Sequence, residues 1–254
     1  MSDTPLLLTP GPLTTSDSVK RAMLRDWGSR DSDFIALTKR VRDALVRTAG
    51  ADVTRGDHAC VLLQGSGTFA VEAALDSLVP RRAGLLVLIN GAYGERIVKI
   101  AERLGRRVAV HRTNEDEPPS AADIDEMLAA DPALSHVVLV QCETTSGILN
   151  PLDEIAEAVR RRGRALIVDA MSAFGALPVD AVRQGLTAVI ASSNKCLEGV
   201  PGIGFVIAKT DALRAAEGNA SSLSLDLADQ WQYFEKTGFY RRDIGWREIA
   251  RLRG

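Results

Sequence analysis

The sequence predicts an α/β fold, with a mostly parallel β-sheet and helices on both of its faces. Short apolar runs alternate with segments of helical periodicity between residues 59 and 208. The runs are apolar throughout, as expected of parallel strands buried on both faces. At 254 residues, of which 46% are hydrophobic and 25% charged, the chain is long enough for one large domain with a substantial core.

The first 48 residues precede this alternation. Residues 1–18 contain three prolines and no helical period, so we expect an extended arm with a turn at residues 10–12. Helix signals begin at Ser16–Ser18, where small polar residues suit an N-cap. A second helix is expected at about residues 34–48, because apolar side chains recur on one face there.

The alternation itself predicts most of the remaining elements. Strands are expected at residues 59–63, 85–90, 107–111, 137–142, 165–168, 187–191 and 204–208, and helices at residues 68–78, 95–104, 121–130 and 152–162. The pattern weakens after residue 210. There we expect a short helix at residues 213–217, an amphipathic helix at residues 223–234 and a short basic tail.

Composition argues against several classes of protein. The formal net charge is −2, whereas a nucleic-acid binder usually carries a basic field. Three cysteines and three histidines are too scattered for a disulfide framework or a metal site. Neither a signal peptide nor a run of about 20 apolar residues is present. We therefore expect a cytoplasmic protein with no metal, membrane or nucleic-acid partner.

An aspartate and a lysine follow two of the predicted strands. Asp169 ends the strand at residues 165–168, and the strand at residues 187–191 continues into Ser192-Ser193-Asn194-Lys195. The carboxyl ends of parallel strands meet at one edge of a sheet, where open α/β sheets bind ligands. Pyridoxal phosphate needs a lysine for its Schiff base and a carboxylate for its pyridinium nitrogen. Singly, Asp169 is typical of a helix N-cap and Lys195 of a solvated surface residue.

A glycine-rich turn, Gly65-Ser66-Gly67-Thr68, lies between a predicted strand and a predicted helix. Helix N-terminal N–H groups and the two hydroxyls suit a phosphate. With Ala70 the turn also fits the dinucleotide pattern G-x-G-x-x-A, which requires an acidic residue near the end of the next strand. That strand ends at Asn90 instead, so a nicotinamide cofactor is disfavoured. A purely structural turn is an equally good interpretation of this motif alone.

Two further loops follow strands. Residues 90–94 carry Tyr93, whose ring could stack on a planar ligand, although packing tyrosines are more common. Residues 141–147 carry Glu143 and several hydroxyls, a composition that is usually that of a plain loop. The loops become informative together, because each lies at the carboxyl end of a strand.

With these residues assembled, the chain resembles the class V aminotransferases of pyridoxal-phosphate fold type I. The resemblance covers about residues 5–238 and rests on LLLTPGPLTTSDSVKRAMLRDWGSRDSDF (6–34), LLQGSGTFAVEAAL (62–75), NGAYGER (90–96), CETTSGILNPL (142–152), IVDAMSAFGALPVD (167–180) and SSNKCLEGVPGIGFV (192–206). It implies pyridoxal 5′-phosphate as the cofactor. Lys195 would form the Schiff base and move the substrate proton, Asp169 would keep the pyridine nitrogen protonated, and Tyr93 would stack on the ring.

The other implied site residues lie in loops at strand ends or in the N-terminal turn. They are Ser66, Gly67, Thr68, Ser192 and Asn194 for the cofactor phosphate, Thr144 or Thr145 for its phenolic oxygen, and Pro10 and Gly11 for the substrate.

The resemblance also implies a reaction and an assembly. The amino group of 2-aminoethylphosphonate would pass to pyruvate, giving phosphonoacetaldehyde and L-alanine, in a homodimer. Family members continue past the point matching Gly238 with a small domain that holds the substrate's anionic group. Here the sequence continues as FYRRDIGWREIARLRG. We thus expect an arm (1–18), a cofactor-binding large domain (19–238) and a divergent tail (239–254), with the small domain largely missing.

Two alternatives stay open at this point. One is another class V transaminase, acting on alanine and glyoxylate or on serine and pyruvate. The other is a truncated, non-catalytic remnant that binds the cofactor without turnover.

Overall fold

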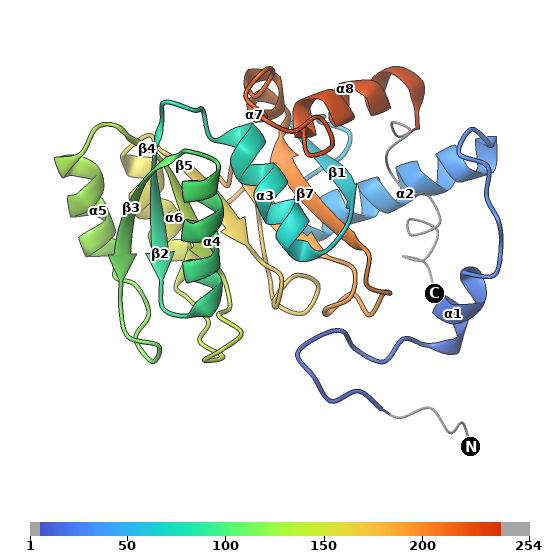
Figure 1. Ribbon diagram of the computed structural model, residues 1–254, viewed down its shortest axis with the longest axis horizontal. Helices are drawn as coiled ribbons and strands as arrows, with labels where there is room; N and C mark the ends of the chain where they lie inside the picture. Colours follow the sequence, from blue (N-terminus) through green and yellow to red (C-terminus); the bar gives the residue numbers. More distant parts are fainter. Residues whose placement is uncertain (1–5, 240–254) are drawn as a thin grey trace.

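A seven-stranded sheet is the centre of the computed structural model, which describes residues 6–239 (Figure 1). Four of its six strand pairings are parallel, and β7 runs antiparallel to both of its neighbours. The strand order is β1-β7-β6-β5-β4-β2-β3. The strands are β1 (His58–Gln64), β2 (Gly84–Ile89), β3 (Arg107–Arg112), β4 (Leu134–Val140), β5 (Ala165–Asp169), β6 (Ala188–Ser192) and β7 (Ile203–Lys209). The predicted α/β class is confirmed.

Helices cover both faces of this sheet, as predicted. The helices are α1 (Asp17–Ala22), α2 (Ser32–Thr48), α3 (Gly67–Leu78), α4 (Ala92–Arg103), α5 (Ala121–Ala130), α6 (Leu152–Arg161), α7 (Thr210–Ala215) and α8 (Leu227–Thr237). One hydrophobic core lies between the sheet and α2, α5 and α6. The second lies between the sheet and α3, α4, α7 and the first half of α8.

Strand β2 shows why the strand sequences are apolar throughout. Leu86 and Leu88 belong to one core, while Leu85, Val87 and Ile89 belong to the other. All five are at most 2% exposed. Since successive side chains of a strand point to opposite faces, a strand between two helical layers has no face left for polar residues.

Helix boundaries differ from the prediction where a capping group decides them. We expected the last helix to begin at residue 223, but α8 begins at Leu227 because the Asp226 side chain accepts a hydrogen bond from Asp229 N (3.0 Å) and caps it. Leu223 is 74% exposed and lies outside the helix. Ser16 caps α1 in the same way, as predicted, by accepting from Val19 N (3.3 Å). N-cap chemistry thus outweighs apolar periodicity at these ends.

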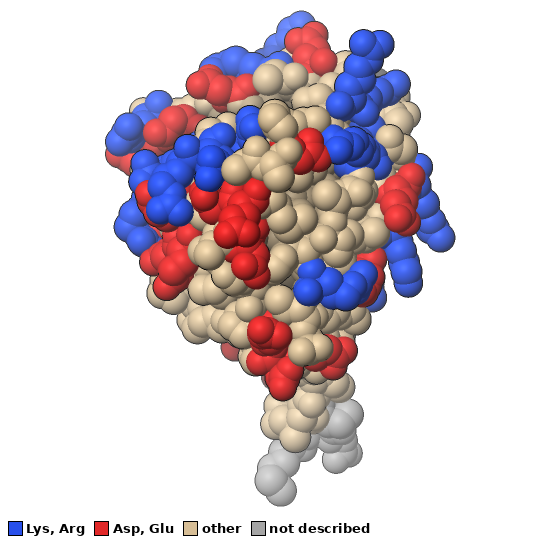
Figure 2. Space-filling model, turned by 90° about the vertical axis from the view of Figure 1, so that its left-hand side faces the viewer, with Lys and Arg blue, Asp and Glu red and all other residues tan. Residues whose placement is uncertain are grey.

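The remaining features of the fold are the chain termini and the charged surface. Residues 6–16 contain no helix or strand, and the predicted tail lies outside the described residues except for Phe239. Over the described range, no helix is both long and apolar enough to cross a bilayer. On the face that carries α5 and β3, acidic and basic side chains are interspersed (Figure 2). Ion pairs such as Arg107–Asp131 (2.6 Å) neutralise them locally.

The two-sided burial of β2 can be tested by truncation. Leu86→Ala removes a side chain that is fully buried, so we expect it to lower the free energy of unfolding by about 2–5 kcal/mol in a urea titration. Leu149→Ala is the control, because Leu149 is 53% exposed and its truncation should cost less than about 0.5 kcal/mol. Equal losses in the two variants would contradict the core position of β2.

Candidate active site

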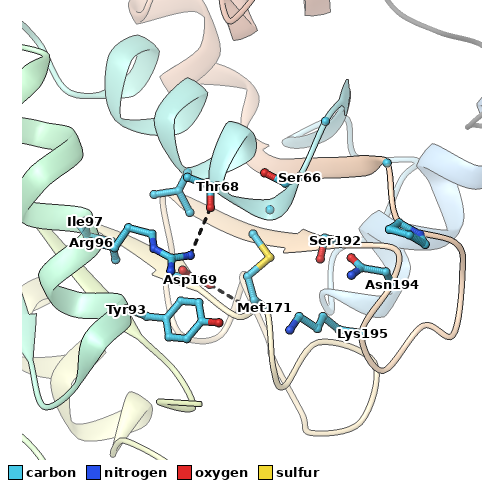
Figure 3. Close-up of a pocket in the computed structure, with 15 residues that line it drawn as sticks. Ser66, Thr68, Tyr93, Arg96, Ile97, Asp169, Met171, Ser192, Asn194 and Lys195 are labelled. Atoms are coloured by element: carbon cyan, nitrogen blue, oxygen red, sulfur yellow. Dashed lines mark hydrogen bonds between the residues drawn. The ribbon is translucent and has the colours of Figure 1, made fainter. Parts of the chain in front are cut away.

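A cavity of about 480 Å³ opens at the carboxyl ends of β5 and β6, beside the N-terminal ends of α3 and α4. Its walls come from loops that are far apart in the sequence, as Figure 3 shows. Eight residues predicted from the sequence line it: Ser66, Gly67, Thr68, Tyr93, Asp169, Ser192, Asn194 and Lys195. Their convergence follows from the parallel strands, whose carboxyl ends lie at one edge of the sheet.

Asp169 is the buried anionic group of this cavity. It ends β5, is 3% exposed, and accepts a hydrogen bond at Oδ1 from Met171 N (3.0 Å). Within residues 6–239, its other oxygen, Oδ2, accepts no hydrogen bond. The pKa of Asp169 is raised to about 6, chiefly by burial and also by Glu143, while Met171 N, Arg96 and Lys195 oppose the rise. A buried carboxylate with one uncommitted oxygen is suited to a cationic or N–H donor in the cavity.

Lys195 lies just past β6, in a loop that is tied back to the sheet. Glu198 N donates to Lys195 O (2.8 Å), and Gly65 N donates to Gly202 O (2.8 Å) at the far end of the loop. This second bond shows that the end of the loop turns back towards the sheet. The lysine is half-buried, and Figure 3 shows its side chain extended into the cavity.

The N-terminal turn passes directly over this lysine. A Cβ on Gly11 would lie 2.3 Å from Lys195 Cδ, so any other residue there would require the lysine side chain to shift. The φ of Gly11 is +151°, a conformation that also favours glycine. The structure therefore brings Gly11 to Lys195, although neither Pro10 nor Gly11 is among the residues that line the cavity.

The start of α3 forms the electropositive end of the cavity. Its first turn contains no acidic residue, and the side chain of the N-cap, Ser66, makes no capping hydrogen bond. The free N–H groups and the helix dipole therefore favour an anion here. Gly67 lets the start of α3 pack closely against Met171, since a Cβ there would lie 2.6 Å from Met171 Sδ.

Tyr93 is positioned by a carboxylate from another loop. Its N–H donates to Glu143 Oε2 (3.2 Å), which caps the start of α4. Glu143 is completely buried, and Gly91 is required beside it because a Cβ there would lie 2.3 Å from Glu143 Cγ. This cap explains why α4 begins at Ala92, three residues before the predicted start. No local sequence signal announces a cap that comes from 50 residues away.

The two candidate threonines lie beside the cavity and make other contacts. Thr144 Oγ1 shares a hydrogen bond with Ser172 Oγ (2.6 Å), and Thr145 Oγ1 donates to Glu143 Oε1 (3.0 Å). Neither is among the lining residues. Their contact with a ligand oxygen stays a prediction.

Sequence reasoning missed several side chains that line the cavity, among them Arg96 and Met171. Arg96 follows Tyr93 by three residues on α4, and its guanidinium carbon lies 4.8 Å from the centre of the Tyr93 ring. The i, i+3 spacing was visible in the sequence and could have identified it. Met171 follows Asp169 by two residues, but the turn that points its side chain inward depends on the Asp169 Oδ1 hydrogen bond.

Two other kinds of site find no support in the geometry. Asn90, at the position where a dinucleotide fold needs a carboxylate, is buried and donates to Asn150 Oδ1 (2.8 Å). Across the described residues, no group of three or more His, Cys, Asp or Glu side chains could hold a metal ion. The three cysteines there are free thiols, and burial raises the pKa of Cys60 to about 12.

Comparison with known proteins gives consistent matches. The family described as "Aminotransferase class-V" matches residues 24–233. A 2-aminoethylphosphonate–pyruvate transaminase of Pseudomonas putida is 58% identical over 241 residues, covering 95% of this chain and 65% of the relative. The enzyme of the same name from Pseudomonas aeruginosa is 57% identical, covering 93% and 63%. This chain therefore spans about two-thirds or slightly less of the length of these relatives.

Solved structures match the whole described fold. An alanine–glyoxylate aminotransferase from Nostoc superposes with a TM-score of 0.90 at 24% identity, covering 99% of this chain and 67% of that one. A pyridoxamine–pyruvate aminotransferase from Mesorhizobium loti gives 0.87 at 26% identity, covering 99% and 64%.

The raised pKa of Asp169 predicts a pH-dependent stability of the ligand-free protein. Because the folded-state pKa of Asp169, about 6, lies above the ordinary value of 3.8 for an aspartate, ionisation of Asp169 destabilises the fold as pH rises from about 4 to 6. Asp169→Asn removes this charge. We expect the variant to gain on the order of 3 kcal/mol relative to wild type between pH 4 and 7.

Urea titrations across this pH range measure the difference. Asp116→Asn, an exposed aspartate, should follow the wild-type curve throughout. A gain for Asp169→Asn that is independent of pH would show that the burial of the charge is not its cause.

Proposed function

Because this chain belongs to the class V aminotransferase family, we propose that it transfers the amino group of 2-aminoethylphosphonate to pyruvate, giving phosphonoacetaldehyde and L-alanine. The observation that carries this proposal is the 58% identity with the Pseudomonas putida transaminase of that name. The pyridoxamine–pyruvate and alanine–glyoxylate aminotransferases that match in structure are 26% and 24% identical to this chain. The cofactor of the family is pyridoxal 5′-phosphate.

The residues of the cavity fit this cofactor. A pyridine nitrogen would meet the free Oδ2 of Asp169, and a phosphate would meet the start of α3 at Ser66, Gly67 and Thr68. Lys195 would bind the cofactor covalently through Nζ. When bound, pyridoxal phosphate supplies an electron sink for bonds to the substrate Cα.

The protein's own groups would then act as follows. Lys195 lines the cavity and would accept and return the substrate proton at Nζ. A cation beside Asp169 would restore its ionised form by opposing the cost of burial. Tyr93 and Met171 would exclude water from the faces of the ring.

The same proposal extends to assembly and location. Leu6, Leu8 and Leu24 are 71%, 87% and 83% exposed, and Phe69 is 50% exposed. Exposed apolar side chains of this size support a homodimer, in which a second copy would cover them. The free cysteines are typical of a reducing compartment such as the cytoplasm.

Two measurements on the full 254-residue chain test the proposed function. Pyridoxal phosphate should give a protein-bound absorbance band that Lys195→Ala abolishes. The control Lys99→Ala, which changes an exposed lysine on α4 outside the cavity lining, should retain the band. Alanine formed from 2-aminoethylphosphonate and pyruvate should fall about 10³-fold or more in Lys195→Ala.

Each alternative has its own outcome in these assays. Alanine formed from serine but not from the phosphonate would favour another class V transaminase. An absorbance band without turnover would favour a cofactor-binding protein that is not a catalyst.

A further inference from the structure

We propose that Arg96 binds a tetrahedral dianion in the cavity and holds it against the start of α3. The dianion would be the phosphate of the cofactor or the phosphonate of the amino donor, two groups that share their charge and oxygen geometry. This inference rests on the proposed function and adds to it a recognition residue outside the predicted set.

Arg96 has no carboxylate partner in the described part of the chain. The nearest acid along α4, Glu95, pairs with Arg112 on β3. The buried Glu143 is committed to Tyr93 N, Thr145 N and Thr145 Oγ1. Among residues 6–239, the one hydrogen bond that Arg96 makes is a long one, from Nη1 to Thr68 Oγ1 (3.5 Å). Most of its five N–H donors therefore remain available to a ligand.

The surroundings hold this guanidinium at one end of the cavity. Its carbon lies 4.8 Å from the centre of the Tyr93 ring, a cation–π contact that orients the side chain. Figure 3 shows Arg96 reaching from α4 towards Thr68 at the start of α3. The arginine thus bridges two helices across the cavity wall.

Electrostatics make an anion the expected occupant. The N-terminal end of a helix carries a partial positive charge, and the first turn of α3 contains no acidic residue to balance it. An arginine beside that end adds a second positive charge, which is unfavourable until an anion lies between them. Asp169 lies close enough for Arg96 to lower its pKa, but a carboxylate hydrogen-bonded to Met171 N is not free to move to α3.

The chemistry of the side chain suits a phosphate or a phosphonate. A guanidinium presents paired N–H groups that match two oxygens of a tetrahedral anion, whereas a lysine offers only a point charge. We therefore expect Arg96→Lys to keep part of the effect and Arg96→Gln to lose it.

The test compares ligands with and without the phosphate. Apoprotein of the full chain is titrated with pyridoxal phosphate and with pyridoxal, and binding is followed by absorbance. For Arg96→Gln we expect the Kd of pyridoxal phosphate to rise about 10- to 100-fold and that of pyridoxal to change less than about twofold. Arg103→Gln, an exposed arginine on the same helix outside the cavity, should match wild type.

A second arm identifies the source of the dianion. The phosphonate is the ligand if Arg96→Gln leaves cofactor binding unchanged but raises KM for 2-aminoethylphosphonate about tenfold or more. In that case, KM for alanine in the reverse direction should be unchanged. Either result supports the inference. The inference is overturned if Arg96→Gln changes neither cofactor binding nor the KM for 2-aminoethylphosphonate. It is also overturned if the affinities for pyridoxal and pyridoxal phosphate fall equally, which would mean that Arg96 acts only by supporting Tyr93.

The inference and the proposed function can fail separately. Wild-type protein that binds no pyridoxal phosphate overturns the proposed function. Inorganic phosphate, followed by calorimetric titration, then decides the role of Arg96: binding that is lost in Arg96→Gln supports it, and binding that is equal in both proteins, or absent, overturns it. Melting curves of Arg96→Gln and Arg96→Lys confirm that the compared proteins are folded.

Discussion

The cavity depends on the parallel pairing of β5 with both of its neighbours. Asp169 lies opposite Val140 of β4 and Ile190 of β6, so the three strands end at nearly the same level. The pairing continues past the strand ends, where Gln141 N donates to Asp169 O (2.8 Å) and Ala170 N donates to Ile190 O (2.9 Å). These bonds anchor the backbone that presents the aspartate, and β6 in turn delivers Lys195 to the same edge. A slip in register would separate the two groups.

Two acidic and two basic side chains lie in or beside the cavity, and the acids and bases are at different ends. Asp169 and Glu143 are buried acids, while Arg96 and Lys195 are the basic groups on its walls. The acids are held deep at the sheet edge, and Arg96 lies beside the positive end of α3. Such a site presents an acceptor to one end of a ligand and donors to the other, and orientation follows from that polarity.

Loops pack closely around this arrangement. Gly11 lies against Lys195, Gly67 against Met171 and Gly91 against Glu143, each so closely that a Cβ on the glycine would lie less than 3 Å from the facing side chain. The three contacts join loops that are distant in sequence around one cavity. Each therefore limits the movement of a residue that would contact a ligand.

The sequence by itself determined the α/β class, because strands buried on both faces must be apolar throughout. It also placed Asp169 and Lys195 at one sheet edge, because the carboxyl ends of parallel strands lie together. It also located the cap of α1, since Ser16 bonds to a residue three positions away. Only the tertiary structure decided the start of α4, the direction of Thr145 and the approach of Arg96 to Thr68. The physical reason is distance along the chain: Glu143 caps a helix 50 residues away, and Arg96 meets Thr68 28 residues away. Contacts of that kind exist only once the strands between them have paired.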